Sequence, residues 1–171
     1  MRRARGLVLV GLVGAALSVA SSAHAEDISG TIVRTLILSE NSRLVGNVTC
    51  TVTGAPCIAF GAPGLELRLN GFFITGQADP TQACSGTSVA NEVGVSTNGQ
   101  NDVEVKGPGV VQQFRADGVL VLGTVGGRIE RITATTNCLS GIRVIETSSH
   151  IRVESNVSVR NGAPGGACGG I

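Results

Sequence analysis

Charged residues recur beside apolar residues in four short stretches of the sequence, at a spacing that brings them into columns. The stretches begin at Leu65, Val103, Ile129 and Ile151. If these four positions are equivalent, one outward column contains Glu66, Glu104, Glu130 and Arg152, and its neighbour contains Asp102, Arg128 and His150. Carboxylates stacked in this way repel one another unless a cation or an arginine lies between them.

Two interpretations of these carboxylates are open. Glycoside hydrolysis needs two carboxylates about 5 Å or about 6.5–9.5 Å apart, one of them with a raised pKa, and stacked positions can meet either distance. The simpler interpretation is a solvated surface whose ion pairs contribute at most about 1 kcal/mol each. The cations available to neutralise it are Arg68, Lys106, Arg131 and Arg152.

The first 25 residues have the features of a secretory signal peptide. Three arginines precede the apolar run from Leu7 to Val19, and Ala23-His24-Ala25 supplies small residues for cleavage. The run is shorter than the roughly 20 apolar residues of a membrane span, so we expect a secreted protein, extracellular or periplasmic, without a span. The mature domain would be residues 26–171.

Composition excludes some partners and several catalytic centres. Cleavage removes three of the 13 basic residues and none of the 12 acidic residues, which leaves a net charge near −2 and no basic block for nucleic acid. His150 is then the one remaining histidine. A zinc site or a Ser-His-Asp triad would depend on it alone, without a Gly-x-Ser-x-Gly motif. We expect no metal and no cofactor.

The mature region contains five cysteines, an odd number. Cys50 and Cys57 bracket Thr-Gly-Ala-Pro, which has the composition of a turn, so we predict a local disulfide between them. The pairing of Cys84, Cys138 and Cys168 stays open. One of the five is left with a free thiol or a partner outside the chain.

A repeat of 23–24 residues organises the chain. Its markers are Gly94-Val95, Gly118-Val119 and Gly141-Ile142, each followed by a second stretch of alternating apolar and polar residues. Alternation with period two predicts strands with one buried face, and no helical spacing is sustained after residue 25. Short strands between Gly and Asn corners favour stacked coils. A β-sandwich stays the alternative, because Asn-Gly pairs also occur in hairpins.

These features resemble the right-handed parallel β-helix proteins of the pectate-lyase-like superfamily. The resemblance covers roughly Ile28 to Gly165 and rests on the Gly-x-x-Val strand starts and on the stretch Leu65–Gly76. It implies an all-β solenoid of about five coils. Some lyases of the superfamily hold Ca²⁺ with carboxylates and use an arginine as base. The resemblance therefore implies a calcium cofactor only if the chain is a lyase.

The chain departs from the motifs of the enzymes in that superfamily. Asn-Thr-Asp, Asp-Asp, Gly-His-Gly and Arg-Ile-Lys are absent, and Asp79-Pro80-Thr81-Gln82 matches Asp-Pro-His-Asp poorly. The repeat is also interrupted near residues 77–92, where we expect a loop insertion. After Gly169-Gly170-Ile171 a further coil would only have begun, and we expect self-association through an open C-terminal end.

The sequence therefore favours a non-catalytic structural or surface-recognition module, with extracellular or cell-surface polysaccharide as its partner. The alternative is the N-terminal part of a polysaccharide lyase or glycoside hydrolase, with catalytic residues on later coils or at Glu66, Glu104 and Glu130. A carbohydrate site would gain from an aromatic platform. Of the adjacent Phe72 and Phe73, one ring should point inward and the other outward.

Overall fold

A computed structural model describes residues 25–79, 89, 91–162 and 170–171. Within these ranges the regular structure is all strand, as predicted, and there is no helix. The strands are β1 (Glu26–Ile32), β2 (Leu36–Leu38), β3 (Ser42–Cys50), β4 (Ile58–Phe60), β5 (Glu66–Arg68), β6 (Phe73–Thr75), β7 (Val95–Ser96), β8 (Val103–Gln112), β9 (Val119–Leu122), β10 (Val125–Thr135), β11 (Ile142–Ile145), β12 (Ser149–Glu154) and β13 (Val157–Val159).

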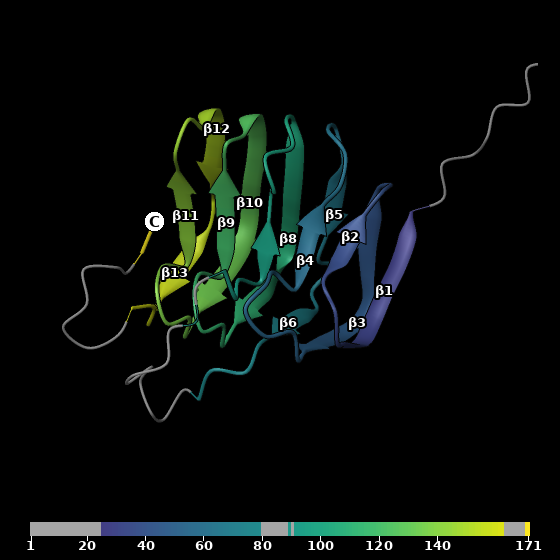
Figure 1. Ribbon diagram of the computed structural model, residues 1–171, viewed down its shortest axis with the longest axis vertical. Helices are drawn as coiled ribbons and strands as arrows, with labels where there is room; N and C mark the ends of the chain where they lie inside the picture. Colours follow the sequence, from purple (N-terminus) through teal and green to yellow (C-terminus); the bar gives the residue numbers. More distant parts are fainter. Residues whose placement is uncertain (1–24, 80–88, 90, 163–169) are drawn as a thin grey trace, which may run out of the picture.

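The strands form two parallel sheets (Figure 1). The long sheet has the order β1-β3-β5-β8-β10-β12, with β6 beside β3 and β8, and β13 beside β10. The short sheet has the order β2-β4-β7-β9-β11. Every pairing between the described strands is parallel. In each repeat the chain passes through both sheets, and in two places it contributes two consecutive strands to the long sheet, β5 with β6 and β12 with β13.

The core lies between the two sheets, and period-two alternation decides which side chains enter it. In the long sheet Leu67, Val105 and Ile129 occupy paired positions and are buried. In the short sheet Ile58, Val95 and Val119 do the same, and Phe60 fills the space beside them. Small branched side chains suit this narrow interior because paired strands bring equivalent residues within about 5 Å of one another.

The repeat glycines are needed for close stacking of the repeats. A Cβ atom at Gly94 would lie 2.6 Å from the carbonyl oxygen of Gly118, and one at Gly118 would lie 2.6 Å from that of Gly141. Neither glycine has a positive φ, so packing rather than backbone conformation requires them here. The 23–24-residue period of these glycines is thus the period at which backbone lies on backbone.

The predicted register of the long sheet is wrong at one repeat. Ile129 pairs with Val105 and Val153, two residues from the predicted partners Val103 and Ile151. The position that does pair with Val103 and Ile151 is Gly127. Glycine has no side chain that would mark this position as inward. The sequence pattern therefore pointed to Ile129, the next apolar residue, as the equivalent of Val103 and Ile151. Because the error is two residues, the faces of the strand are unchanged.

The predicted disulfide between Cys50 and Cys57 is present, with the two Cα atoms 5.9 Å apart. Both cysteines are buried, and the bond closes the loop between β3 and β4. Cys138 is also buried and disulfide-bonded. Cys84 and Cys168 lie outside the described residues.

Two other predictions fall on regions that are described in part or not at all. The predicted insertion at 77–92 is described at residues 77–79, 89 and 91–92, and the predicted signal peptide at residue 25 alone. Within the described residues no helix has the length and apolar character to cross a membrane.

Candidate functional site

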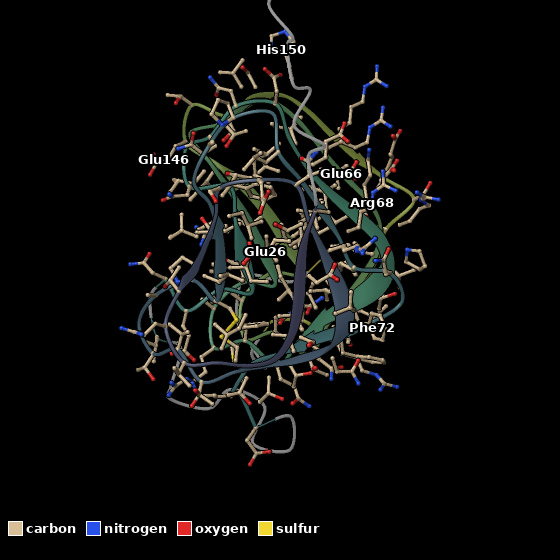
Figure 2. All side chains as sticks on the ribbon, turned by 90° about the vertical axis from the view of Figure 1, so that its right-hand side faces the viewer. Glu26, Glu66, Arg68, Phe72, Glu146 and His150 are labelled. Atoms are coloured by element: carbon tan, nitrogen blue, oxygen red, sulfur yellow. A yellow bond between two sulfur atoms is a disulfide. The ribbon has the colours of Figure 1, made fainter. Side chains whose placement is uncertain are left out.

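The long sheet carries charged side chains on its outer surface along β5, the first residues of β8, the middle of β10, and β12. We call this surface the charged face. Its first column runs through directly paired positions of β5, β8, β10 and β12, which are Glu66, Glu104, Arg128 and Arg152. The second column extends to the N-terminal edge and contains Asp27, Arg43, Arg68, Lys106, Glu130 and Glu154. Glu66 and Arg68 point outward side by side in Figure 2.

The shifted register changes the predicted columns at two places. Arg128 rather than Glu130 follows Glu104 in the first column, so the predicted row of three stacked glutamates does not form. Glu130 instead lies opposite Lys106. In the predicted neighbouring column, Asp102 and His150 are equivalent as predicted. Gly126, not Arg128, occupies the position between them.

Ion pairs neutralise the stacked carboxylates. Lys106 bridges Glu66, at 2.6 Å, and Glu104, and Arg68 also bonds to Glu66. Arg128 lies 3.4 Å from both Glu130 and Glu154. Opposite charges therefore alternate around Glu66 and Glu104, as the solvated-surface interpretation expects.

These pairs also decide which protonation state Glu66 adopts. Burial opposes the charged form, but hydrogen bonds from Arg68 and Lys106 outweigh it and hold the pKa of Glu66 below its usual value. A general acid of a glycosidase needs the opposite shift, a pKa raised toward neutrality. Glu66 is thus a permanently ionised carboxylate at neutral pH and does not fit that role.

A notch lies at the end of the charged face, where β10 has two consecutive glycines. The neighbouring strands carry Asp102-Val103 and His150-Ile151 where β10 carries Gly126-Gly127. The Asp102 carboxylate turns over Gly126, so that a Cβ atom there would lie 2.1 Å from its Oδ1 atom. Beside this contact lies a hollow of about 210 Å³. Its lining consists of Asp102, Glu104, Gly127, Arg128, His150 and Arg152.

The notch brings two arginines together on neighbouring strands. Arg128 and Arg152 occupy directly paired positions, and His150 lies one corner away, at the top of the molecule in Figure 2. Within the described part of the chain Arg152 belongs to no ion pair, whereas Arg128 has two carboxylate partners. Stacked like charges repel, and an anionic group held between them would relieve the repulsion.

A metal centre finds no support among the described residues. They include no group of three or more His, Cys, Asp or Glu side chains placed to hold a metal ion. Asp102 and Glu104 reach the notch together, but Lys106 is already bonded to Glu104. Arg128 and Arg152 also line the hollow and would repel a metal ion.

The burial of two acidic residues was not predicted from the sequence. Glu92 is 2% exposed and accepts hydrogen bonds from the Arg115 guanidinium, at 2.5 and 2.7 Å, and from the Gly54 amide. Glu92 falls in the predicted insertion, where no repeat pattern marks it as inward. The Gly54 bond ties the disulfide loop to Glu92, and the bidentate pair ties Glu92 to Arg115 of the next repeat, so the role of Glu92 is structural.

Asp117 is the second buried acid. Its Oδ1 atom accepts a 2.8 Å hydrogen bond from the Ser140 amide of the next repeat, and Arg143 lies 3.7 Å from its other oxygen. Burial raises the pKa of Asp117 despite these partners. The one feature of the sequence that could have indicated its burial is its position directly before the repeat glycine Gly118.

Opposite pKa shifts at Glu66 and Asp117 predict opposite pH dependences of stability. The folded state lowers the pKa of Glu66 below 4.5, so its stabilising contribution is present above that pH and is lost as the pH falls. The folded state raises the pKa of Asp117 above 3.8, so its contribution is present at low pH and is lost as the pH rises through the raised value.

Two variants with uncharged side chains test these opposite pH dependences of stability. Relative to wild type, Glu66→Gln should become less stable as the pH rises from about 4 to 7, and Asp117→Asn should become more stable over the same interval. Urea denaturation at several pH values measures both. Parallel curves for the two variants would contradict these assignments.

Phe73 supplies the exposed ring that the sequence left undetermined. It is 40% exposed on the outer surface of β6, whereas Phe72 is partly buried and packs against the core. Asn47 and Val110 flank Phe73 on the neighbouring strands. Both are uncharged, so the outer surface of the long sheet is neutral around this ring. A single ring on a flat surface is a weaker candidate than the notch, which combines a hollow with converging charges.

In comparisons with known proteins the chain matches no protein-family model, no curated protein and no solved structure.

Proposed function

We propose that the chain is an exported right-handed parallel β-helix of the pectate-lyase-like kind that recognises acidic polysaccharide without cleaving it. Parallel pairing at offsets of one repeat, in both sheets, supports a solenoid. The Cys50–Cys57 disulfide supports an oxidising compartment, and the Ala23-His24-Ala25 cleavage signal supports export.

The observation that carries the proposed ligand is the pairing of Arg128 with Arg152 at the rim of the notch. A uronate carboxylate accepts two parallel hydrogen bonds from one guanidinium, which gives arginine its preference for planar anions. Arg152 has no carboxylate partner of its own among the described residues, so a bound uronate displaces no existing ion pair from it.

The carboxylates of the charged face argue against cleavage. Glu66 is held ionised by Arg68 and Lys106, and Lys106 also neutralises Glu104. Glu130 lies beside Lys106 and is paired with Arg128 and Arg131. A hydrolase would need one protonated acid near neutral pH, and the lowered pKa of Glu66 is the opposite of that requirement.

Replacement of Arg152 tests the ligand. We expect Arg152→Gln to weaken binding to polygalacturonate by about tenfold, since the variant removes a charge-assisted hydrogen bond pair. Binding is measured by affinity electrophoresis or calorimetry at low salt, with dextran as the neutral polysaccharide. Arg34→Gln is the matched control, because Arg34 lies between β1 and β2 and the change in net charge is the same.

The outcomes separate recognition from catalysis. Equal losses in both variants, or equal binding of dextran, would contradict a site for acidic glycans at the notch. Shortened polysaccharide, with or without added Ca²⁺, and loss of that activity in Glu104→Gln would instead establish the lyase or hydrolase alternative. Retention of polygalacturonate without shortening supports recognition.

A further inference from the structure

A pocket of about 310 Å³ lies on the outer surface of the short sheet, whereas the notch lies on the long sheet. Leu120 and Leu122 of β9 form its floor, and residues 54–56 of the loop between β3 and β4 form one wall. Three polar side chains complete its described lining: Asn91, Ser96 and Asn98. We call this hollow the loop pocket. Its volume is that of a small-ligand site, for which the lower limit is about 300 Å³.

Two anchors hold the wall of the loop pocket in place. The Cys50–Cys57 disulfide closes the loop at its base. The Gly54 amide donates a 3.2 Å hydrogen bond to Glu92, whose carboxylate is fixed from the other side by Arg115. A wall that is already fixed lowers the cost of ordering the site when a ligand binds.

The floor of the loop pocket is apolar although it belongs to the outward side of the sheet. Val121 points into the core, so Leu120 and Leu122 on either side of it point away from the core. Leu120 is only 8% exposed, since it packs in a small apolar cluster with Val93 and Ala116. Leu122 packs against the same cluster. The floor therefore offers a surface on which a ligand can bury C–H groups.

The polar side chains leave hydrogen-bonding groups free for a ligand. Ser96 is 3% exposed, its Oγ atom accepts a 3.1 Å hydrogen bond from the Asn98 amide, and its hydroxyl hydrogen has no acceptor among the described residues. Asn98 Nδ2 donates to the Phe60 carbonyl, at 3.2 Å, which leaves Asn98 Oδ1 as an acceptor. Asn91 adds an amide that both donates and accepts. Donors beside acceptors suit hydroxyl groups, because a hydroxyl also does both.

No charged side chain is among the described residues of the loop pocket. An ionised carboxylate that entered it would lose hydration without meeting a cation, which costs free energy. We propose that the loop pocket binds one neutral hexopyranose unit, with the C–H face of the ring on the two leucines and its hydroxyls bonded to Ser96 and Asn98. This site is separate from the notch and does not depend on the acidic ligand proposed there.

NMR spectroscopy of the ¹⁵N-labelled protein, residues 26–171, tests where sugars bind. At least one of D-glucose, D-galactose and D-mannose should produce saturable shifts in the amide signals of Ser96, Asn98 and Leu122. The corresponding uronates, in which a carboxylate replaces the terminal hydroxymethyl group, should leave these signals unchanged. The amide signals of Arg128 and Arg152 report on the notch, so failure at one site is distinguished from failure at the other.

Removal of single polar groups tests the contacts of the bound sugar. Ser96→Ala should weaken its binding by about fivefold, because the variant loses one neutral hydrogen bond. Asn91→Gly should weaken it by a similar factor. Asn91 is exposed and has a φ of 68°, which glycine adopts without strain, so this variant keeps the fold. Ser29→Ala is the matched control, because Ser29 is an exposed serine of β1 in the long sheet, and its affinity should equal that of wild type.

Four results would overturn the proposal, with the folding of each variant confirmed by circular dichroism. The first is that none of the three neutral sugars shifts the signals of the loop pocket. The second is that the uronates shift them as strongly as the neutral sugars do. The third is that the folded Ser96→Ala and Asn91→Gly variants bind with wild-type affinity, and the fourth is an equal loss in Ser29→Ala. If Ser96→Ala does not fold, Asn91→Gly decides alone.

Discussion

Ile129→Asp is expected to abolish folding of the domain. Ile129 is 1% exposed and lies between Val105 and Val153 at the centre of the inward column of the long sheet. The substitution removes a buried aliphatic side chain and places a carboxylate among the apolar side chains of the core. The expected loss is more than about 4 kcal/mol, a large part of the roughly 5–15 kcal/mol that stabilises a domain.

Val153→Asp is the matched control for that variant. Val153 occupies the same column one repeat later, but it is half-buried on the edge strand β12. A carboxylate there can reach water, so this variant should fold and melt a few degrees below wild type. Thermal unfolding followed by circular dichroism makes the comparison. If Ile129→Asp melts within about 3 °C of wild type, the loss is about 1 kcal/mol or less, and the register assigned to Ile129 is wrong.

Gly118→Ala is expected to have the next largest effect, although it adds a single methyl group. The added Cβ atom would lie 2.6 Å from the Gly141 carbonyl oxygen and 2.7 Å from Asn137 Nδ2. Backbone on one side cannot rotate away, so the neighbouring repeats would have to separate. That movement strains the hydrogen bonds of the Gly118 and Val119 amides, which are 3.0 and 2.9 Å long. We expect a loss of about 3 kcal/mol.

A glycine in open space provides the control. Nothing lies within 4 Å of a Cβ atom built at Gly170, and its φ is not positive, so Gly170→Ala should leave stability unchanged. Gly118→Ala should melt roughly 10 °C below wild type by the usual relation between stability and melting temperature. Equal melting temperatures for the two variants would show that the repeats do not stack backbone on backbone at this glycine.

The faces of the strands were predictable from the sequence because side-chain alternation is local. Period two identifies Val103 and Val105 as inward and Glu104 as outward whatever strand lies beside them. The repeat glycines were predictable for a related reason, since close contact between backbones leaves room for no other residue. Cys50 and Cys57 were predictable because a short turn brings its own ends together.

Register and long-range partners were harder to predict. The position of Gly127 is defined by the strands on either side of it, and its missing side chain removed the signal that would have aligned them. The Glu92–Arg115 and Asp117–Ser140 contacts join residues 23 positions apart. Each partner taken alone resembles an ordinary surface residue, so pairing becomes visible only once the repeats are superimposed.

The notch illustrates both cases. The sequence placed Asp102 and His150 in one column, which the pairing confirms, but it did not show that Gly126 lies between them with the Asp102 carboxylate turned over it. It also assigned Arg128 to the wrong column. The two-residue correction is what brings Arg128 beside Arg152 and creates the proposed anion site.

A crystal structure of residues 26–171 tests most directly whether successive repeats lie in parallel and in this register. We expect Ile129 to be paired with Val105 on one side and Val153 on the other, with Glu104, Arg128 and Arg152 in one outward column. Strands joined by antiparallel hairpins, or Ile129 paired with Val103, would contradict both the fold and the site built on it.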